Sequence, residues 1–447
     1  MNAPKYALIQ LVSEETMPNV IAALALEPAS ITMLHTASTA TEASWIKRAI
    51  RHAGLTQPIR SLPLSRAPDI METAAKVCRT CKHALAIGLQ PVVNINGGTK
   101  LMSIGAFAAT IGPALSAIYV DTECRRFLQP GKVPIPESLR DGDAAFTRAE
   151  LRLNVDVVAA THGHNQISAG EDPTPYIELA EYLRAHPAEE HYCHHVFAAL
   201  SSNGPMVEQL AMLDRRLPEL PAGLTRLALA AGLLETRGGC HYIACRTRET
   251  IESAIRSPLN STEFFAATRS LQFPQTFLNG GWWEVCVWHA AKQSGTFRDL
   301  RWSVRFGSDI NHTEEDVVGV KGPNLALFSC KRGGPGARLH RGFEEFVSAA
   351  RRLGGPSTTK YFCVAAPTRE AHMTQVREEA VRVRAKIVTP ALRLTPDAFT
   401  AWAPIPAPMP AKTAYARQAD QGKEGVQSGD LAEPQKGEED PATSSTA

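Results

Sequence analysis

Residues 91–102 read PVVNINGGTKLM, and this stretch decides the fold class of the N-terminal part of the chain. An apolar run typical of a buried strand is followed by a glycine pair, Gly97 and Gly98, and then by a helical pattern that starts at Lys100. Thr99 is suited to cap this helix, whose free N–H groups favour an anion. The spacing matches neither the phosphate loop of nucleoside triphosphatases nor Gly-x-Gly-x-x-Gly. The stretch therefore predicts an anion-binding turn; the alternative is an ordinary turn between a strand and a helix.

The same alternation of strand and helix extends from about residue 5 to residue 120. Strands are expected at 6–12, 30–34, 59–62, 91–95 and 116–120, and helices at 18–26, 42–52, 69–83 and 100–111. This pattern is typical of a doubly wound parallel sheet, where ligands bind beyond the carboxyl ends of the strands. The candidate ligand residues accordingly follow the first, second and fourth strands: Ser13, Thr16, Thr36, Asn96, Gly97, Gly98, Thr99 and Lys100.

Length and composition limit the possible classes of protein. A chain of 447 residues predicts two or three domains, and a net charge of +2 carries no global signature of nucleic-acid binding. Nine cysteines at irregular spacings, with no signal peptide and no long apolar run, predict free thiols, a cytoplasmic location and no membrane association. Cys78 and Cys81 have the spacing of half a zinc site, but they lie in a helical pattern without a second pair, which favours two cysteines on a helix face.

Shifts in composition suggest four segments. An α/β domain is expected at 1–140, a mostly helical connector at 141–274, a second α/β domain at 275–403, and a disordered tail rich in Ala, Pro, Lys, Glu, Gln and Ser at 404–447. Within the connector, an apolar helix at 224–234 leads into a hairpin at 235–243 that is similar to the wing of a winged-helix module. The alternative for this module is a connector that packs against its neighbours without touching nucleic acid.

The second α/β domain carries a set of residues suited to phosphodiester cleavage. Glu284 stands in the first turns of an expected helix, Asp316 lies in a strand at 313–320, and Lys331 ends a strand at 325–331. Carboxylates can hold Mg²⁺ or Mn²⁺ against a phosphate, and a lysine can orient the attacking water. Asp316 and Glu284 are the predicted metal ligands, with the backbone carbonyl of Cys330 completing the set. The alternative is a half-exposed sheet edge with scattered charges.

With both ends considered together, the chain resembles CRISPR-associated ancillary nucleases that join a Rossmann-like CARF domain to a PD-(D/E)XK restriction-endonuclease-like domain. The stretches that carry the resemblance are residues 11–20, 94–102, 279–284, 314–316 and 353–355. The resemblance implies a homodimer that binds a cyclic oligoadenylate, most often cyclic tetra-adenylate. It also implies a metal-dependent endonuclease that acts on DNA or RNA in type III CRISPR defence.

One position departs from the family pattern. The second acidic position, two residues before Lys331, is Ser329, and a hydroxyl is a weaker ligand for a hard divalent cation than a carboxylate. Ser329 is therefore retained as a candidate catalytic residue. The alternative function is a cyclic-oligoadenylate sensor without catalytic activity. A third possibility is slow cleavage of the activator by the CARF domain itself, through Thr99 and Lys100.

Overall fold

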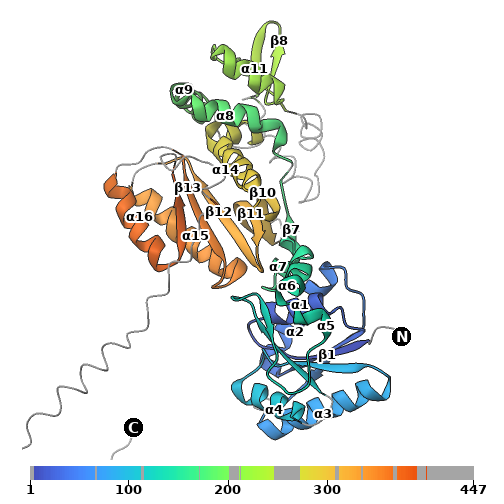
Figure 1. Ribbon diagram of the computed structural model, residues 1–447. Coiled ribbons are helices and arrows are strands. Elements are labelled where there is room, and N and C mark those ends of the chain that lie inside the picture. The colour runs from blue at the N-terminus through green and yellow to red at the C-terminus, as the bar shows by residue number, and fades with distance from the viewer. Residues whose placement is uncertain are drawn as a thin grey trace, which may run out of the picture. The chain divides into compact units, whose positions relative to one another are not determined.

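The computed structural model describes residues 5–65, 68–111, 115–170, 172–200, 211, 213–245, 272–307, 312–333, 336–365, 370–389 and 399 (Figure 1). Met1–Thr400 forms one compact unit by its internal contacts. The predicted domain boundaries near residues 140, 274 and 403 stay predictions, and the predicted disordered tail lies outside the described residues.

The N-terminal sheet has the predicted doubly wound architecture. Its strands are β1 (Tyr6–Leu11), β2 (Ser30–His35), β3 (Ile59–Pro63), β4 (Gln90–Asn94), β5 (Ser116–Asp121) and β6 (Arg126–Leu128). They pair in the order β3-β2-β1-β4-β5-β6, with parallel neighbours up to β5 and an antiparallel β6 at the edge. The sequence prediction of this parallel sheet is confirmed.

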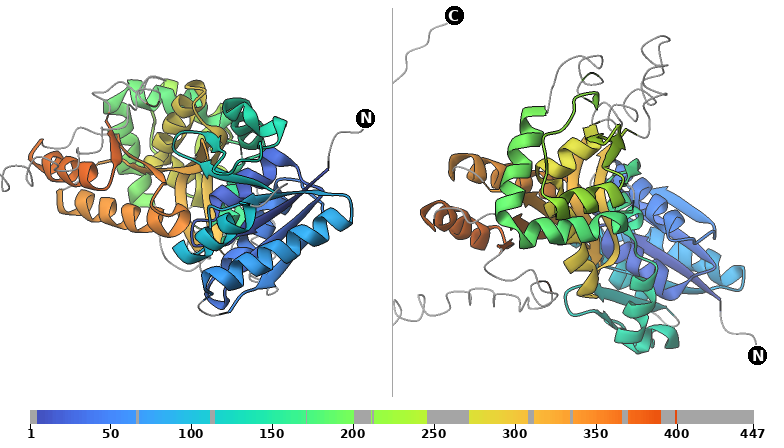
Figure 2. Two further views of the ribbon diagram at one scale, coloured as in Figure 1. Left: turned by 60° about the horizontal axis from the view of Figure 1, so that its bottom comes forward. Right: turned by 90° about the horizontal axis from the view of Figure 1, so that it is seen from above.

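Helices cover both faces of this sheet (Figures 1 and 2). Successive side chains of β1 point to opposite faces, and because both sets include apolar residues, both faces must be covered. Leu8 belongs to a core with residues of α1 (Met17–Leu26) and α2 (Ala40–His52). Ile9 belongs to a separate core with residues of α3 (Ile70–Ala86) and α4 (Lys100–Thr110). A short 3-10 turn, η1 (Ala37–Thr39), precedes α2. Cys78 and Cys81 both lie on α3, as the helix interpretation predicts, and all nine cysteines are free thiols.

The middle of the chain is mainly helical where it is described. Its elements are α5 (Glu137–Arg140), α6 (Gly142–Leu151), α7 (Val155–Ala160), β7 (Ile167–Ser168), η2 (Thr174–Tyr176), α8 (Ile177–Ala185), α9 (Pro187–Leu200), α11 (Ala222–Ala230), β8 (Leu234–Arg237) and β9 (Cys240–Ile243). Near the expected positions, α11 is followed by the antiparallel hairpin of β8 and β9, although the helix ends at Ala230. The similarity of this hairpin to a winged-helix module stays a prediction. Strand β7 was not expected from the sequence.

The C-terminal sheet lies between helices. Its elements are η3 (Phe277–Gly281), α14 (Trp282–Gln293), β10 (Arg298–Gly307), β11 (His312–Lys321), β12 (Asn324–Lys331), α15 (Gly336–Gly354), β13 (Thr359–Val364), α16 (Glu370–Arg382) and β14 (Ala385–Val388). The strand order is β14-β13-β12-β11-β10-β7, parallel from β12 to β14 and antiparallel elsewhere. Helix α14 packs on one face, and α15 and α16 pack on the other (Figure 1).

Sequence reasoning placed the helix with Glu284 and the strands β11 and β12 correctly, but it missed β10. This strand begins Arg-Asp-Leu-Arg, and such a charged start hides the alternation that predicts a strand. Among the described residues, no helix combines the length and apolar character needed to cross a membrane.

Candidate functional site

The glycine turn lies where the carboxyl ends of β1 and β4 meet. These strands are parallel neighbours, with Gln10 paired to Asn94, so the loops that follow them emerge at the same edge. Gly97 packs directly against the Leu11 carbonyl at the end of β1, leaving no space for a Cβ atom. Gly98 has a φ of 79°, a conformation that favours glycine. The turn therefore needs both glycines, one for close approach and one for its backbone angle.

The start of α4 has the geometry predicted for an anion site. The Thr99 hydroxyl accepts a hydrogen bond from the Met102 N–H at 3.3 Å, which confirms Thr99 as the N-cap. Thr99 and Lys100 are exposed at the first turn of the helix. Asn96 has a structural role beside them, because its Nδ2 donates to the Val120 carbonyl at 2.8 Å and its Oδ1 accepts from the Val120 N–H. The first turn of α4, with Thr99 and Lys100, is therefore exposed, and a ligand role for these residues stays a prediction.

The remaining candidate ligand residues lie at the same edge but use their hydroxyls in protein contacts. Thr36 Oγ1 is 2.8 Å from Ser38 Oγ, and Ser13 Oγ donates weakly to the Glu15 carbonyl. Thr16 is only 3% exposed, and its Oγ1 donates to the Thr161 carbonyl at 2.8 Å. A ligand role for these three residues stays a prediction; Thr16 in this structure joins the loop after β1 to the end of α7.

The C-terminal candidates Glu284 and Asp316 form a pair of poorly solvated carboxylates. Trp302 Nε1–H donates to Glu284 Oε2 at 2.9 Å, and the Cys330 N–H donates to Asp316 Oδ2. Burial raises the pKa of the Glu284 carboxyl well above its ordinary value, and the charge of Asp316 raises it further. Burial also raises the pKa of Asp316, against the opposing charge of Lys331. The pKa of both carboxyls is therefore raised even though the Lys331 ammonium favours their charged forms.

Lys331 completes the predicted set, with its Nζ 3.9 Å from Asp316 Oδ2. The donor chemistry fits Mg²⁺ or Mn²⁺, since hard divalent cations prefer carboxylate oxygens and a bound cation relieves the repulsion within such a pair. The Cys330 backbone lies against Asp316, whereas Ser329 is buried and offers only a hydroxyl. Within the described residues, three possible side-chain ligands lie within 4.8 Å of one another at a different place, His340, Glu344 and Glu379. Contacts of the His340 ring nitrogens with the two glutamate carboxylates, at 3.7 and 2.9 Å, account for this cluster.

The two carboxylates that precede Asp316 in the chain, Glu314 and Glu315, have different environments. Glu314 is engaged by Ser303 Oγ and by Arg305 Nε, both at 3.0 Å. Glu315 is buried, and its pKa is raised to about 8 by burial and by the charge of Asp316. Sequence reasoning did not propose Glu315 as a functional residue. Its position next to Asp316 was visible, but its burial depends on packing that the spacing does not reveal.

Comparison with known proteins identifies the N-terminal part. Residues 7–130 match the family model described as the Card1 CARF domain. The N-terminal sheet with its helices is a CARF domain. Among curated proteins, none matches the sequence of this chain.

The fold extends beyond the CARF domain in solved structures. The chain is similar to Can2 from Sulfobacillus thermosulfidooxidans, solved in complex with cyclic tetra-adenylate, with 18% identity and a TM-score of 0.59 over 89% of this chain and 98% of that chain. It is also similar to a protein from Vibrio cholerae of known crystal structure, with 13% identity and a TM-score of 0.60 over 88% of this chain and 96% of that chain. At these identities the likeness establishes a shared fold over most of the chain.

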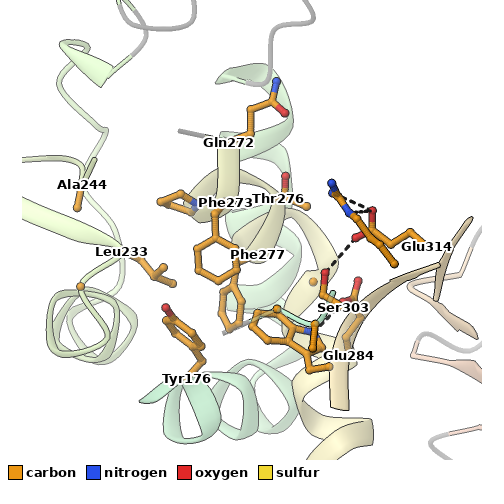
Figure 3. A pocket seen from close by; sticks show the side chains of 17 residues that line it. Tyr176, Leu233, Ala244, Gln272, Phe273, Thr276, Phe277, Glu284, Ser303 and Glu314 are labelled. Carbon is orange, nitrogen blue, oxygen red and sulfur yellow. Dashed lines mark hydrogen bonds and ion pairs between the residues drawn. The ribbon is translucent and has the colours of Figure 1, made fainter. Parts of the chain in front are cut away.

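Beyond the CARF domain, a pocket of about 480 Å³ is lined by one of the candidate catalytic carboxylates, Glu284 (Figure 3). Glu284, Ser303 and Glu314 lie on one side of it, and the rings of Tyr176, Phe273, Phe277 and Trp302 contribute to its lining. The Phe273 and Trp302 ring centroids are 5.7 Å apart. The rings of Tyr176, Phe277 and Trp302 are buried and pack on one another, so they form a rigid apolar wall. A phosphate would face the acidic side of the pocket only across a bound cation, because like charges repel. This pocket could not be predicted from the sequence, because its walls come from four separate segments.

The segment that follows α7 contacts the end of α15. Beyond Thr161, His162 packs beside Gly355, and His164 Nε2 lies 3.3 Å from the Arg352 carbonyl near the end of α15. Burial lowers the pKa of His162 to about 4, and the neighbouring His164 adds to the effect. The folded protein therefore holds His162 neutral at the pH where an unfolded chain would protonate it.

This histidine predicts a specific pH dependence of stability. Between about pH 6.5 and pH 4, His162 is protonated in the unfolded chain but neutral in the folded protein. The free energy of unfolding therefore falls as the pH falls. We expect the native chain to lose about 2 kcal/mol more than His162→Gln between pH 7.5 and pH 5. Urea denaturation at the two pH values measures this difference. Equal losses in both chains would show that His162 is solvated in the folded state.

Proposed function

We propose that this protein is a cyclic-oligoadenylate-activated, metal-dependent nuclease of type III CRISPR defence. The observation that carries the proposal is the presence, on one chain, of a CARF domain and of two poorly solvated carboxylates beside a lysine. The first part can sense a ligand, and the second can cleave a phosphodiester. The fold likeness to Can2, which was solved with cyclic tetra-adenylate, supports this pairing.

The activator site in this proposal is the edge of the CARF domain with Gly97, Gly98, Thr99 and Lys100. A helix N-terminus with a lysine in its first turn attracts phosphate. The α4 helix also exposes Leu101 and Ile104, and the exposed Ile111 follows directly after its end. An exposed apolar surface of this kind fits an interface between two copies of the chain. We propose a homodimer in which two such loops surround one symmetric cyclic oligoadenylate, cyclic tetra-adenylate in the first instance.

The catalytic site in this proposal consists of Glu284, which lines the pocket, and of Asp316 and Lys331. Glu284, Asp316 and the Cys330 carbonyl would hold Mg²⁺ or Mn²⁺, which supplies a water of lowered pKa and stabilises charge on the phosphate. Lys331, close to Asp316, is placed to orient that water and to stabilise negative charge as it develops. Trp302 and the Cys330 N–H hold the two carboxylates in position.

Cleavage assays test this function directly. Plasmid DNA, single-stranded DNA and single-stranded RNA are incubated with the full chain and Mn²⁺, with and without cyclic tetra-adenylate. We expect cleavage only when activator and metal are both present, and none after chelation with EDTA. Cleavage that is independent of the activator would contradict the proposed switch.

A specific observation favours a second function, a sensor without nuclease activity. Ser329 replaces the second acidic residue of the family pattern, and Glu314, which stands close by, is already paired with Arg305. In that case the protein would bind cyclic tetra-adenylate tightly and cleave none of the three substrates. The same assays, combined with calorimetry of activator binding, distinguish the two functions.

Lys100 gives a separate test of the activator site. The Lys100→Ala variant removes an exposed charge at the start of α4, and a charge-assisted hydrogen bond to phosphate is strong. We expect roughly a 10-fold to 100-fold weaker affinity for cyclic tetra-adenylate, with unchanged thermal stability. Isothermal titration calorimetry measures the affinity, and Lys82→Ala, an exposed lysine on α3, is the control. Equal affinities in all three chains would remove Lys100 from the activator site.

A further inference from the structure

A second pocket, at the end of the C-terminal sheet opposite to Lys331, is lined by several positively charged side chains. It has a volume of about 270 Å³ and lies where α15 and α16 end and where β13 and β14 begin. Its charged lining consists of Arg351, Lys360, Arg382 and Arg384, with Pro356 and Val383 between them. Lys331 pairs with Val364 at the opposite end of β13, so this pocket is distinct from the candidate catalytic site.

Lys360 shows that this charge is not compensated within the pocket. The residue is only 4% exposed, and its Nζ donates to the Thr358 carbonyl at 2.9 Å. Burial lowers the pKa of Lys360, and the charges of Arg351 and Arg384 lower it further. In the part of the chain that the structure describes, no carboxylate lies within 4 Å of any of the four cations. Lys360 is buried, whereas Arg351, Arg382 and Arg384 are exposed at the mouth of the pocket. A buried ammonium beside exposed guanidinium groups, without a counter-ion, is costly unless an anion joins them.

Arg384 provides a second, independent observation. It has a φ of 53° at the end of α16, the left-handed position where helices usually place glycine or asparagine. Arg351 and Arg382 stand in the last turns of α15 and α16, where the helix dipole favours a cation. The helix dipole is therefore a sufficient reason for the positions of Arg351 and Arg382. It does not explain a buried lysine on a strand or an arginine in a strained backbone conformation.

We propose that this pocket binds a phosphoryl group, carried either by a nucleic-acid backbone or by a small phosphate compound. Arginine forks and a lysine around one space are the groups that proteins use for phosphate. The volume is slightly below the usual range for whole ligands, about 300–1,000 Å³, and this favours a single phosphate or pyrophosphate over a complete nucleotide. The inference does not depend on nuclease activity, because binding alone defines it.

The test uses the full chain and two probes, pyrophosphate and a 12-nucleotide single-stranded DNA, in an Asp316→Asn background that prevents cleavage. Arg384→Gly removes one cation and relieves the strained backbone, so this variant is expected to fold at least as well as the parent. Lys360→Met removes the buried charge. Arg341→Ala, an exposed arginine on α15 outside the pocket, is the matched control. Calorimetry measures pyrophosphate binding, and fluorescence anisotropy measures DNA binding.

We expect Arg384→Gly and Lys360→Met each to weaken pyrophosphate binding by roughly 10-fold or more, with no change in the Arg341→Ala chain. Any binding near Lys100 persists in all variants, so the difference isolates this pocket. A parallel loss of DNA affinity identifies the nucleic-acid backbone as the source of the phosphate, whereas a loss for pyrophosphate alone identifies a small compound. Equal affinities for both probes in the parent, both pocket variants and the control would overturn the proposal.

Discussion

Asp316→Asn is expected to lower activator-stimulated cleavage by at least about 10²-fold to 10³-fold, the usual cost of removing one group that stabilises charge in a transition state. The side chain lies against the Cys330 N–H and 3.9 Å from the Lys331 ammonium. Asparagine can still accept the hydrogen bond from Cys330, but it offers a metal no negative charge. Initial rates of oligonucleotide cleavage at saturating Mn²⁺ measure the loss.

The same variant should not destabilise the fold. Asp316 and Glu284 share a poorly solvated space that raises the pKa of both carboxyls, so removing one of them relieves repulsion. We expect a melting temperature equal to or above that of the native chain when no metal is bound. A change that removes activity while preserving stability is the mark of a functional residue rather than a structural one.

Glu345→Gln is the matched control, since it neutralises an exposed carboxylate on α15 without a nearby partner in the described chain. It should cleave at the native rate. Native activity in Asp316→Asn would exclude this carboxylate from catalysis and would place the reaction elsewhere on the chain. A native chain that binds activator tightly but cleaves nothing would instead support the sensor.

Gly97→Ala should have the largest effect on the CARF domain. A Cβ at this position would lie 1.9 Å from the Leu11 carbonyl oxygen and 2.5 Å from its carbon. These are backbone atoms of a central strand, and the same oxygen accepts a hydrogen bond from Asn19 Nδ2 at 2.9 Å. The turn must therefore move away from β1, at a cost of about 3 kcal/mol or more. Activator affinity should fall with it, because Thr99 and Lys100 move together with the turn.

Thermal unfolding and calorimetry with cyclic tetra-adenylate measure the two effects of Gly97→Ala. Gly131→Ala is the matched control, since the nearest atom to its new Cβ would be the Ala117 Cβ at 3.7 Å, an ordinary contact. Native stability and affinity in Gly97→Ala would show that the turn does not lie against β1. If the variant does not fold, Lys100→Ala still reports on the ligand site alone.

The sequence predicted the CARF architecture well because its signals are local. Each strand of the N-terminal sheet is a short apolar run, and the turn at Gly97 and Gly98 requires residues with special backbone freedom. The Thr99 cap was predicted for the same reason, since it involves atoms only three residues apart. The strands of the C-terminal domain were harder to predict, because β10 has charged residues at positions where most strands have apolar ones.

Candidate residues could be chosen by type but not by environment. Asp316 and Lys331 were proposed as members of one catalytic set, and the structure places Lys331 Nζ 3.9 Å from Asp316 Oδ2. Thr16 was proposed as a ligand residue, yet its hydroxyl is used by Thr161, which lies 145 residues away in sequence. Glu315 was passed over, because nothing local distinguishes a buried glutamate from an exposed one on the same strand.

By itself, the sequence determined the order of strands and helices, the glycine turn with its cap, and the kinds of side chain available for binding phosphate and metal. Only the tertiary structure decided which carboxylates lose their solvation, which aromatic rings form a pocket beside Glu284, and which cations meet around Lys360. The physical reason is that backbone preference acts over a few residues, whereas burial and charge interaction depend on neighbours brought together from distant parts of the chain.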